Sequence, residues 1–356
     1  MKGMFATALA AAFAMLSLWS AVAIATEEID YKIVTASPRG TYIQIGRDLA
    51  TYVAPQAEIN LESVPSAGSG ENVRRLRYEP GVKLALVQSD VFQAFLDMSA
   101  AGNAEAGKVI KPLRLIMPLY NEEIYFVVRK DSSLNYVHEI RDAKINAGEL
   151  GSGTALSTAT LYKLMFNRPI PEQNVSFETN EDALLKLLTD KSIDVVVIIA
   201  GQPAKILTDI KPEARDLIKL LKFDANAPAG KAALKTYFPA TIRQSSYPNL
   251  LTEDIPGLTI KAFLVTYDYQ LKLTRDHLVK FAHSLCENFP ILQTKGHPKW
   301  KEVDLALPEL GRGWTYYPYT TPALRACTNG KAKPSASVAR SCATMEEKVL
   351  GLCSGQ

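Results

Sequence analysis

The chain has 356 residues, and its 40 Lys and Arg residues nearly balance its 37 Asp and Glu residues, giving a formal charge of +3. This balance excludes the general positive field on which binders of nucleic acid or of membrane surfaces rely. Without the first 25 residues about 331 remain, which is long for one hydrophobic core and favours two lobes.

The N-terminus has the pattern of a cleavable export signal. Lys2 gives a positive start, an apolar stretch follows over residues 4–24, and Ala23-Ile24-Ala25 is a small-residue cleavage site. An uncleaved N-terminal membrane anchor is the alternative. No cysteine lies near the cleavage site, so no lipid anchor is expected, and no later segment has the ~18 uncharged apolar residues of a membrane span. We therefore predict a signal peptide over residues 1–25 and a periplasmic protein that does not insert into the membrane after cleavage.

The following residues alternate between strand and helix patterns, as in an α/β fold. Apolar residues spaced three to four apart predict a helix over 41–53. Segment 84–87 is apolar throughout, as a buried strand is. The strands predicted in this part are 31–36, 59–64, 84–87 and 113–119, and the small-residue turn 66–70 leads into a further helix.

A second set of elements begins with segment 123–129, predicted as a strand that crosses into a second lobe. Asn180 is placed to cap a helix over 181–189. Segment 258–267 is predicted as the return crossing, before a helix over 274–289. The β-α units predicted between the crossings are 144–147 with 154–166, 175–178 with 181–189, and 193–199 with 203–210, followed by a strand over 218–223.

These elements predict an α/β fold of two lobes that are joined by crossing strands, with a ligand cleft between them. Lobe I is predicted over 29–121 together with 266–325, lobe II over 122–265, and a cysteine-containing tail over 326–356. Ligands of such sheets bind outside the C-terminal ends of the strands. The small-residue loops of this chain follow predicted strands and therefore lie at that edge.

Two of these loops share one pattern. Residues 35–42 and 148–154 each follow a short apolar run and each open a helix. The start of a helix leaves backbone N–H groups unpaired, so that it can hold an anion. Two such loops on separate α/β units predict that both lobes close on one small anionic or zwitterionic ligand.

Four cysteines, Cys286, Cys327, Cys342 and Cys353, lie in the last fifth of the chain. An even number in an exported protein predicts disulfides. If 335–352 is one helix, the last two are ~16 Å apart along its axis and cannot pair with each other. Each would then reach back to one of the first two, while free buried thiols are the alternative. The close ligand spacing of a zinc site is absent, so no metal is expected.

With these loops in place, the chain resembles the TAXI family of extracytoplasmic solute-binding proteins, the receptors of one class of TRAP transporter. The resemblance covers residues from about 31 to about 325 and depends on the order and spacing of several short segments. These segments are 37–42, 66–72, 84–90, 127–131, 151–154 and 194–203.

The resemblance implies a two-lobed, type II-like periplasmic-binding-protein fold without a cofactor. It implies a receptor that captures a small carboxylate, such as glutamate, a dicarboxylate or a keto acid, and delivers it to a TRAP-type membrane permease. A protein that feeds a sensor kinase instead is the alternative, and a monomer is expected. The cleft-lining loops of the family correspond in this sequence to Ser37, Gly40, Thr41, Tyr42, Gln88, Ser89, Ser152, Gly153 and Thr154.

The chain departs from the family in two places. Arg39 stands where the family usually has a small residue, and the family's His-Pro-Gly motif is absent, with residues 316–319 in that region. Arg39 fits either a bidentate clamp on a ligand carboxylate or a solvated loop arginine. Gln202 could reach the cleft from lobe II, or could simply precede a helix that starts with Pro203.

Several of these residues also fit ordinary structural roles. Ser89, Ser152 and Thr154 could be helix caps, and Tyr42 could serve in packing. The four histidines lack the i+3 or i+4 partner of a helical metal pair, and no nucleophile-elbow or phosphate-loop motif occurs. The chain is therefore predicted to be a binding protein and not an enzyme.

Overall fold

The computed structural model describes residues 29–310 and 313–329. The predicted signal peptide, Cys342, Cys353 and the helix considered over 335–352 lie outside these described residues. Nearly all of the predicted tail lies outside them as well, apart from its first four residues.

The elements alternate as expected for an α/β protein. The strands are β1 Ile29–Val34, β2 Ile59–Val64, β3 Val82–Gln88, β4 Leu113–Arg129, β5 Ile145–Asn146, β6 Val175–Ser176, β7 Val195–Ala200, β8 Ile218–Leu220, β9 Phe238–Ile242 and β10 Ile255–Tyr267. The α-helices are α1 Thr41–Tyr52, α2 Ser69–Tyr78, α3 Ser89–Ala100, α4 Ala104–Ile110, α5 Gly153–Phe166, α6 Asn180–Leu188, α7 Lys205–Thr208, α8 Pro228–Ala233, α9 Lys272–Lys295 and α10 Thr321–Asn329. The short 3-10 helices are η1 Pro55–Ala57, η2 Val137–Asp142, η3 Glu172–Asn174, η4 Pro212–Asp216, η5 Gln244–Ser246 and η6 Pro298–Glu302.

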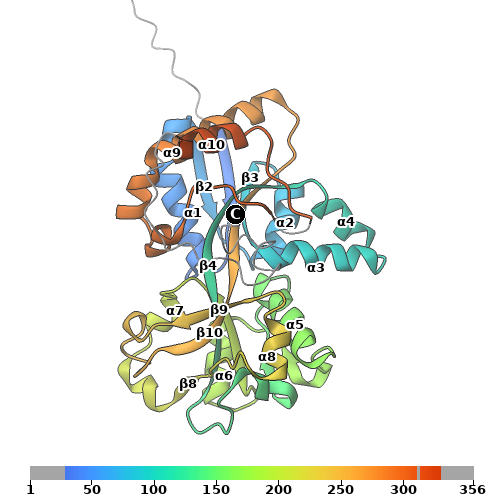
Figure 1. Cartoon of the computed structure of the whole chain (residues 1–356), viewed down its shortest axis with the longest axis vertical. Coiled ribbons are helices and arrows are strands. Elements are labelled where there is room, and N and C mark those ends of the chain that lie inside the picture. The colour runs from blue at the N-terminus through green and yellow to red at the C-terminus, as the bar shows by residue number, and fades with distance from the viewer. Residues whose placement is uncertain (1–28, 311–312, 330–356) are drawn as a thin grey trace, which may run out of the picture.

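One sheet runs through both lobes in the order β2-β1-β3-β10-β4-β7-β5-β6, with β8 paired to β4 and β9 paired to β10. Strands β1, β2 and β3 are parallel to one another, and so are β5, β6 and β7. Strands β4 and β10 lie antiparallel between the two parallel sets and pass from lobe to lobe (Figure 1). The predicted two-lobed α/β fold with crossing strands is thereby confirmed.

We call lobe I the half built on β1–β3 with helices α1–α4, α9 and α10, at the top of Figure 1, and lobe II the half built on β5–β9 with α5–α8. The predicted boundaries at 121/122 and 265/266 fall inside β4 and β10. The level of Asn121 on β4 corresponds to Lys261 on β10, because these two residues are paired.

Strand β4 corrects one expectation. Segments 113–119 and 123–129 are one continuous strand, Leu113–Arg129, and not two. The polar residues Asn121, Glu122 and Glu123 interrupt the apolar pattern, but β10 pairs with them and carries the strand through the interruption. A single strand of 17 residues spans about 56 Å at ~3.3 Å per residue, which is enough to cross both lobes.

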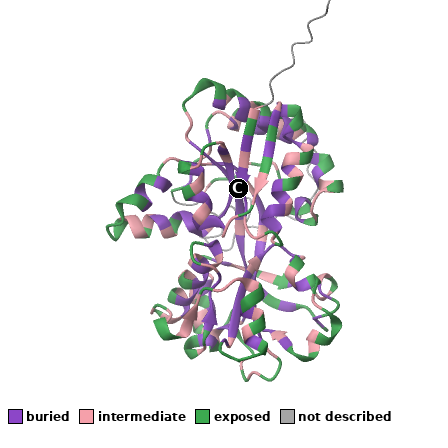
Figure 2. Ribbon diagram, turned by 180° about the vertical axis from the view of Figure 1, so that it is seen from behind, coloured by how far each residue is buried: buried purple, intermediate pink, exposed green. Residues whose placement is uncertain are grey.

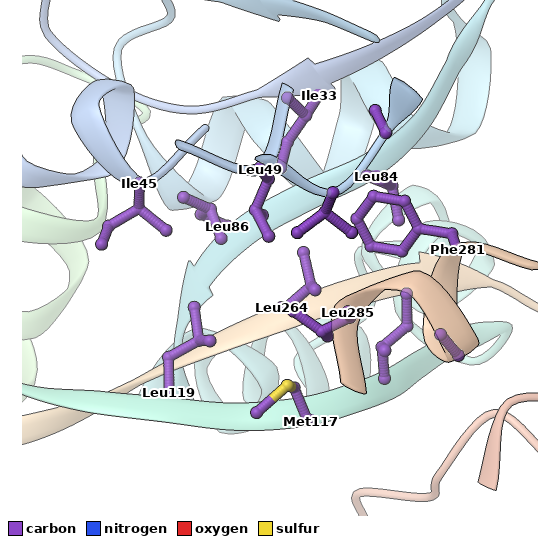
Figure 3. Packing of buried hydrophobic residues seen from close by; sticks show 14 of the residues in the cluster. Ile33, Ile45, Leu49, Leu84, Leu86, Met117, Leu119, Leu264, Phe281 and Leu285 are labelled. Atoms are coloured by element: carbon purple, nitrogen blue, oxygen red, sulfur yellow. The ribbon is translucent and has the colours of Figure 1, made fainter. Parts of the chain in front are cut away.

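The apolar cores lie on the two faces of this sheet. In lobe I, the side chains in Figure 3 pack between the sheet and helices α1 and α9, among them Leu49 of α1, Leu264 of β10 and Phe281 of α9. All three are completely buried. Figure 2 shows the same arrangement for the whole chain, with buried strands through the middle and exposed helix faces at the periphery.

Short sequence patterns predict most helix starts, but the predicted N-cap of α6 is corrected by one residue. Thr179, not Asn180, is the N-cap of α6, because the Thr179 hydroxyl accepts the Asp182 N–H at 3.2 Å. Asn180 is instead the first residue of the helix and lines the cavity described below.

The C-terminal helices are joined by a disulfide that differs from the expected pairing. Cys286 of α9 is bonded to Cys327 of α10, with 5.8 Å between their Cα atoms. The pairing expected if 335–352 is one helix, with a later cysteine bonded to each of these two, is not the pairing found, because α10 packs directly on α9. Within the described residues, no helix is long and apolar enough to span a membrane.

Candidate functional site

A cavity of about 80 Å³ lies where the two lobes meet. At ~10–15 Å³ per water molecule, this volume holds roughly six waters, which suits a small solute and not a peptide or an oligosaccharide. Nine of the eleven predicted site residues line it, namely Ser37, Arg39, Gly40, Thr41, Tyr42, Gln88, Ser152, Gly153 and Thr154.

The starts of three long helices meet at this cavity. Gly40 caps α1 and Gly68 caps α2, and neither residue has a side chain that could satisfy the first-turn N–H groups. Ser152 caps α5 and accepts the Ala155 N–H at 2.9 Å. The positive ends of three helix dipoles, two from lobe I and one from lobe II, therefore face one small space.

A buried carboxyl group lies in the same cavity. Glu122, at the middle of the crossing strand β4, is 2% exposed and lines the cavity. The Tyr42 hydroxyl donates a hydrogen bond of 2.7 Å to its Oε2. The pKa of Glu122 is raised to about 8, mainly by burial and in part by the neighbouring Glu123, against the lowering effect of Tyr42, Lys299 and Gln88. Glu122 is consequently neutral in most molecules at pH 7.

The next residue, Glu123, belongs to a different set of contacts. Lys299 of η6 is completely buried and donates to Glu123 Oε1 at 3.0 Å and to Glu302 Oε2 at 2.8 Å. Glu123 Oε2 accepts the backbone N–H of Gln202 at 2.7 Å. This buried ion pair fixes the C-terminal segment of lobe I and the end of β7 to the same point of the crossing strand.

Two predicted site residues do not line the cavity. The Gln202 side-chain amide donates to Thr241 O at 3.2 Å and accepts the Arg243 N–H at 2.6 Å. Both ends of this amide are therefore bonded to β9 and to the loop that follows it. Ser89 is the first residue of α3, where Gln88 is the N-cap, and its carbonyl accepts the Trp314 indole N–H at 3.2 Å.

Charged side chains form the rim of the cavity. Arg39 is 61% exposed, and its guanidinium lies 3.8 Å from the Glu181 carboxylate of lobe II. Lys205 also lines the cavity and pairs with Asp209 at 2.9 Å. Glu149 lies on the rim as well, and its pKa is raised by burial and by the nearby carboxylates of Glu181, Glu71 and Asp182.

The lobes also contact each other beside the cavity. The Thr41 hydroxyl donates to Gly201 O at 3.2 Å, and the Glu71 N–H donates to Gly151 O at 2.9 Å. On the side of α3, Asp90 Oδ2 accepts hydrogen bonds from the hydroxyls of Ser157, at 2.6 Å, and Tyr237, at 2.9 Å. The structure therefore has its two lobes closed on the cavity.

Sequence reasoning missed several lining residues. Glu122 is the main one, and its signal is a polar interruption in an otherwise apolar crossing strand. The others come from the loop before α1, the start of α2, the loop before α5, the start of α6, the end of β7 and the start of α7. They are Ala36, Ala67, Gly68, Ser69, Gly148, Glu149, Asn180, Glu181, Ile198, Ile199, Ala200, Ala204, Lys205 and Ile206. Among the described residues, no group of three or more His, Cys, Asp or Glu side chains could hold a metal ion.

The strand arrangement and the cavity between the lobes define a two-lobed α/β protein of the periplasmic-binding type. Proteins of this class bind many different ligands, so the fold alone does not identify the ligand. The chain belongs to the NMT1-like family, which it matches over residues 33–310.

The chain is similar in structure to the following three solved proteins. The periplasmic sulfonate-binding protein SsuA of Methylobacillus flagellatus KT is 13% identical, with a TM-score of 0.45 and coverage of 84% of this chain and 77% of that chain. The periplasmic binding protein BugD is 15% identical, with a TM-score of 0.45 and coverage of 76% and 84%. Arginine-bound, truncated ArgBP of T. maritima is 15% identical, with a TM-score of 0.42 and coverage of 72% and 96%. At these scores the ligands of those proteins do not transfer to this chain.

Proposed function

We propose that this protein is an exported solute-binding receptor that captures a small carboxylate between its lobes. The observation that carries the proposal is the convergence of the α1, α2 and α5 N-termini, from both lobes, on one small cavity. Helix N-termini favour anions because their first-turn N–H groups lack partners within the helix and the helix dipole adds a positive potential. In α2 and α5 one such group each, that of Glu71 and that of Ala155, is already bonded within the protein, and the dipoles remain.

The chemistry of the lining supports binding without catalysis. The lining residues offer hydroxyl, amide and backbone groups, and they include neither histidine nor cysteine. A serine or threonine nucleophile needs an adjacent general base, and the histidine that usually supplies it is absent from the lining. We therefore assign the site to recognition of a ligand, with no cofactor.

The closed arrangement supports delivery to a membrane partner. A ligand held by both lobes stabilises the closed form over the open form, and a permease can recognise that form. Following the TAXI resemblance, we propose a TRAP-type permease as the partner and the periplasm as the location. Uptake of labelled ligand into vesicles that contain a TRAP permease, with and without the receptor, tests this step.

A thermal-shift screen of the chain from residue 26 onward tests the ligand class. The panel contains amino acids, dicarboxylates, keto acids and neutral sugars. A ligand at 100 times its Kd adds about 2.7 kcal/mol to the free energy of unfolding, which shifts the melting temperature visibly. We expect shifts with carboxylates and none with neutral sugars.

Two substitutions and a matched control locate the binding. Thr154→Ala and Arg39→Ala should each reduce the carboxylate shift, because both residues line the cavity. Arg47→Ala removes an exposed arginine of α1 that does not line the cavity, and it should leave the shift unchanged. A panel in which only neutral solutes shift the melting temperature would overturn the proposed carboxylate site.

A further inference from the structure

Glu122 is the one carboxyl group buried inside the cavity that the three helix starts share. It is 2% exposed, whereas the other acidic lining residues, Glu149 and Glu181, lie on the rim. In the proposed receptor the ligand anion binds in this same cavity, beside Glu122. A second negative charge there would repel that anion.

The surroundings of Glu122 contain hydrogen-bond donors and further acids, but no cation in contact with it. The groups that face it are the Tyr42 hydroxyl from α1, the Gln88 amide from β3, Tyr120 and Glu123 from β4, and Lys299 from η6. Within residues 29–310 and 313–329, Glu122 forms no ion pair. The nearby ammonium of Lys299 is bonded to Glu123 and Glu302.

The number of buried charges then indicates the protonation state of Glu122. The Lys299 ammonium pairs with the buried Glu123 and with the partly exposed Glu302. An ionised Glu122 would therefore be a second buried carboxylate, without an ion-pair partner among the described residues, which is costly. As a neutral acid, Glu122 can accept the Tyr42 hydroxyl on Oε2 and still has one O–H to donate.

We propose that Glu122 determines the specificity of this site as a neutral carboxylic acid that donates a hydrogen bond to a ligand carboxylate, so that the anion binds only while this proton is present. This inference rests on the proposed carboxylate receptor and adds its recognition group. A neutral Glu122 favours ligands that present a carboxylate, and not an ammonium group, to β4.

The pH dependence follows with a definite sign. Because burial raises the pKa of Glu122 to about 8, the binding-competent neutral form dominates below that pH and is lost above it. Affinity scales with the neutral fraction, so at pH 9 binding should be about tenfold weaker than at pH 7. The bound anion raises the pKa of Glu122 further, because the two like charges repel.

Calorimetric titration of the wild-type protein with succinate, 2-oxoglutarate and L-glutamate between pH 6 and pH 9.5 tests the inference. Glu122→Gln replaces the acid with a neutral donor of the same shape. It should bind with an affinity similar to that of the wild type at pH 7 and should lose the weakening above pH 8. Glu62→Gln changes an exposed carboxyl group of β2 that does not line the cavity, and it should keep the wild-type pH profile.

The possible failures are distinguishable. If none of the three carboxylates binds at any pH, the proposed carboxylate receptor and this inference both fall. If carboxylates bind but the wild-type affinity is flat up to pH 9.5, the inference alone is wrong, whether or not Glu122→Gln folds. If Glu122→Gln loses L-glutamate and keeps succinate, Glu122 binds the ligand ammonium as an ion, and the inference is again wrong.

Discussion

At the scale of single residues, the contact between the lobes requires glycine at position 70. A Cβ atom on Gly70 would lie 2.3 Å from the carbonyl oxygen of Gly151, far inside any real contact. The obstacle is backbone from the other lobe, so it cannot rotate away. Gly70 itself lies in the first turn of α2, where alanine is an ordinary helix residue.

Gly70→Ala should therefore impair closure of the two lobes without impairing folding. Lobe I gains a better helix former, so the melting temperature without ligand should stay the same or rise slightly. Ligand affinity should fall by roughly 5- to 150-fold, because overpacking at such a contact costs about 1–3 kcal/mol. Arg74→Ala, an exposed change on the same helix, should alter neither quantity. Unchanged affinity in Gly70→Ala would mean that the bound form is less closed than this structure.

Single residues also show what the sequence could reveal about the site. The helix-start loops were predictable because glycine, serine and threonine after an apolar run form a local signal. Gln202 has that kind of signal too, but its amide is taken by Thr241 and by Arg243, which are about 40 residues away. A polar interruption of an apolar strand marks Glu122 in the sequence, but its position in the cavity depends on the pairing of β4 with β10 and on the packing of α1, which are distant contacts.

At the scale of elements, the same distinction between local and distant contacts holds. Strands with a regular pattern, alternating in β2 and apolar over residues 84–87 in β3, were predicted at or near their actual bounds. Strand β4 was split because its polar middle is explained only by its neighbours and by the buried Lys299. The disulfide could not be assigned from spacing, because it depends on how α10 packs against α9.

The Cys286–Cys327 disulfide gives the prediction at this scale. It closes a loop with a sequence separation of 41, for which the chain-entropy model gives about 4 kcal/mol of stabilisation. The double variant Cys286→Ala, Cys327→Ala should lower the free energy of unfolding by about 2–4 kcal/mol in guanidinium denaturation. Peptide mapping of the non-reduced protein should link these two cysteines. A map that links either of them to Cys342 or Cys353 would contradict the pairing.

At the scale of the whole molecule, the two lobes close through polar contacts that are sensitive to protonation. Asp90 of α3 is buried by lobe II and accepts the hydroxyls of Ser157 and Tyr237, and its Oδ1 has no hydrogen-bond partner among the described residues. Burial raises the pKa of Asp90 from 3.8 to about 6 in this closed form. When the lobes separate, Asp90 becomes exposed and its pKa returns toward the ordinary value.

Closure of the ligand-free protein should consequently become more favourable as the pH falls. The closed form binds more protons than the open form between about pH 4 and pH 6, so protonation favours closure, and this advantage is lost as the pH rises through about 6. The difference is on the order of 2–3 kcal/mol for a shift of about two pH units. Small-angle X-ray scattering without ligand should give a smaller radius of gyration at pH 5 than at pH 7.5.

Asp90→Asn serves as the matched variant for this measurement, because its amide cannot ionise and still accepts both hydroxyls. It should keep the smaller radius of gyration at pH 7.5 and lose the change between pH 5 and pH 6. Any remaining expansion above pH 7 should then come from Glu122, whose pKa is about 8. An Asp90→Asn protein that expands over the same range as the wild type would show that another group controls closure.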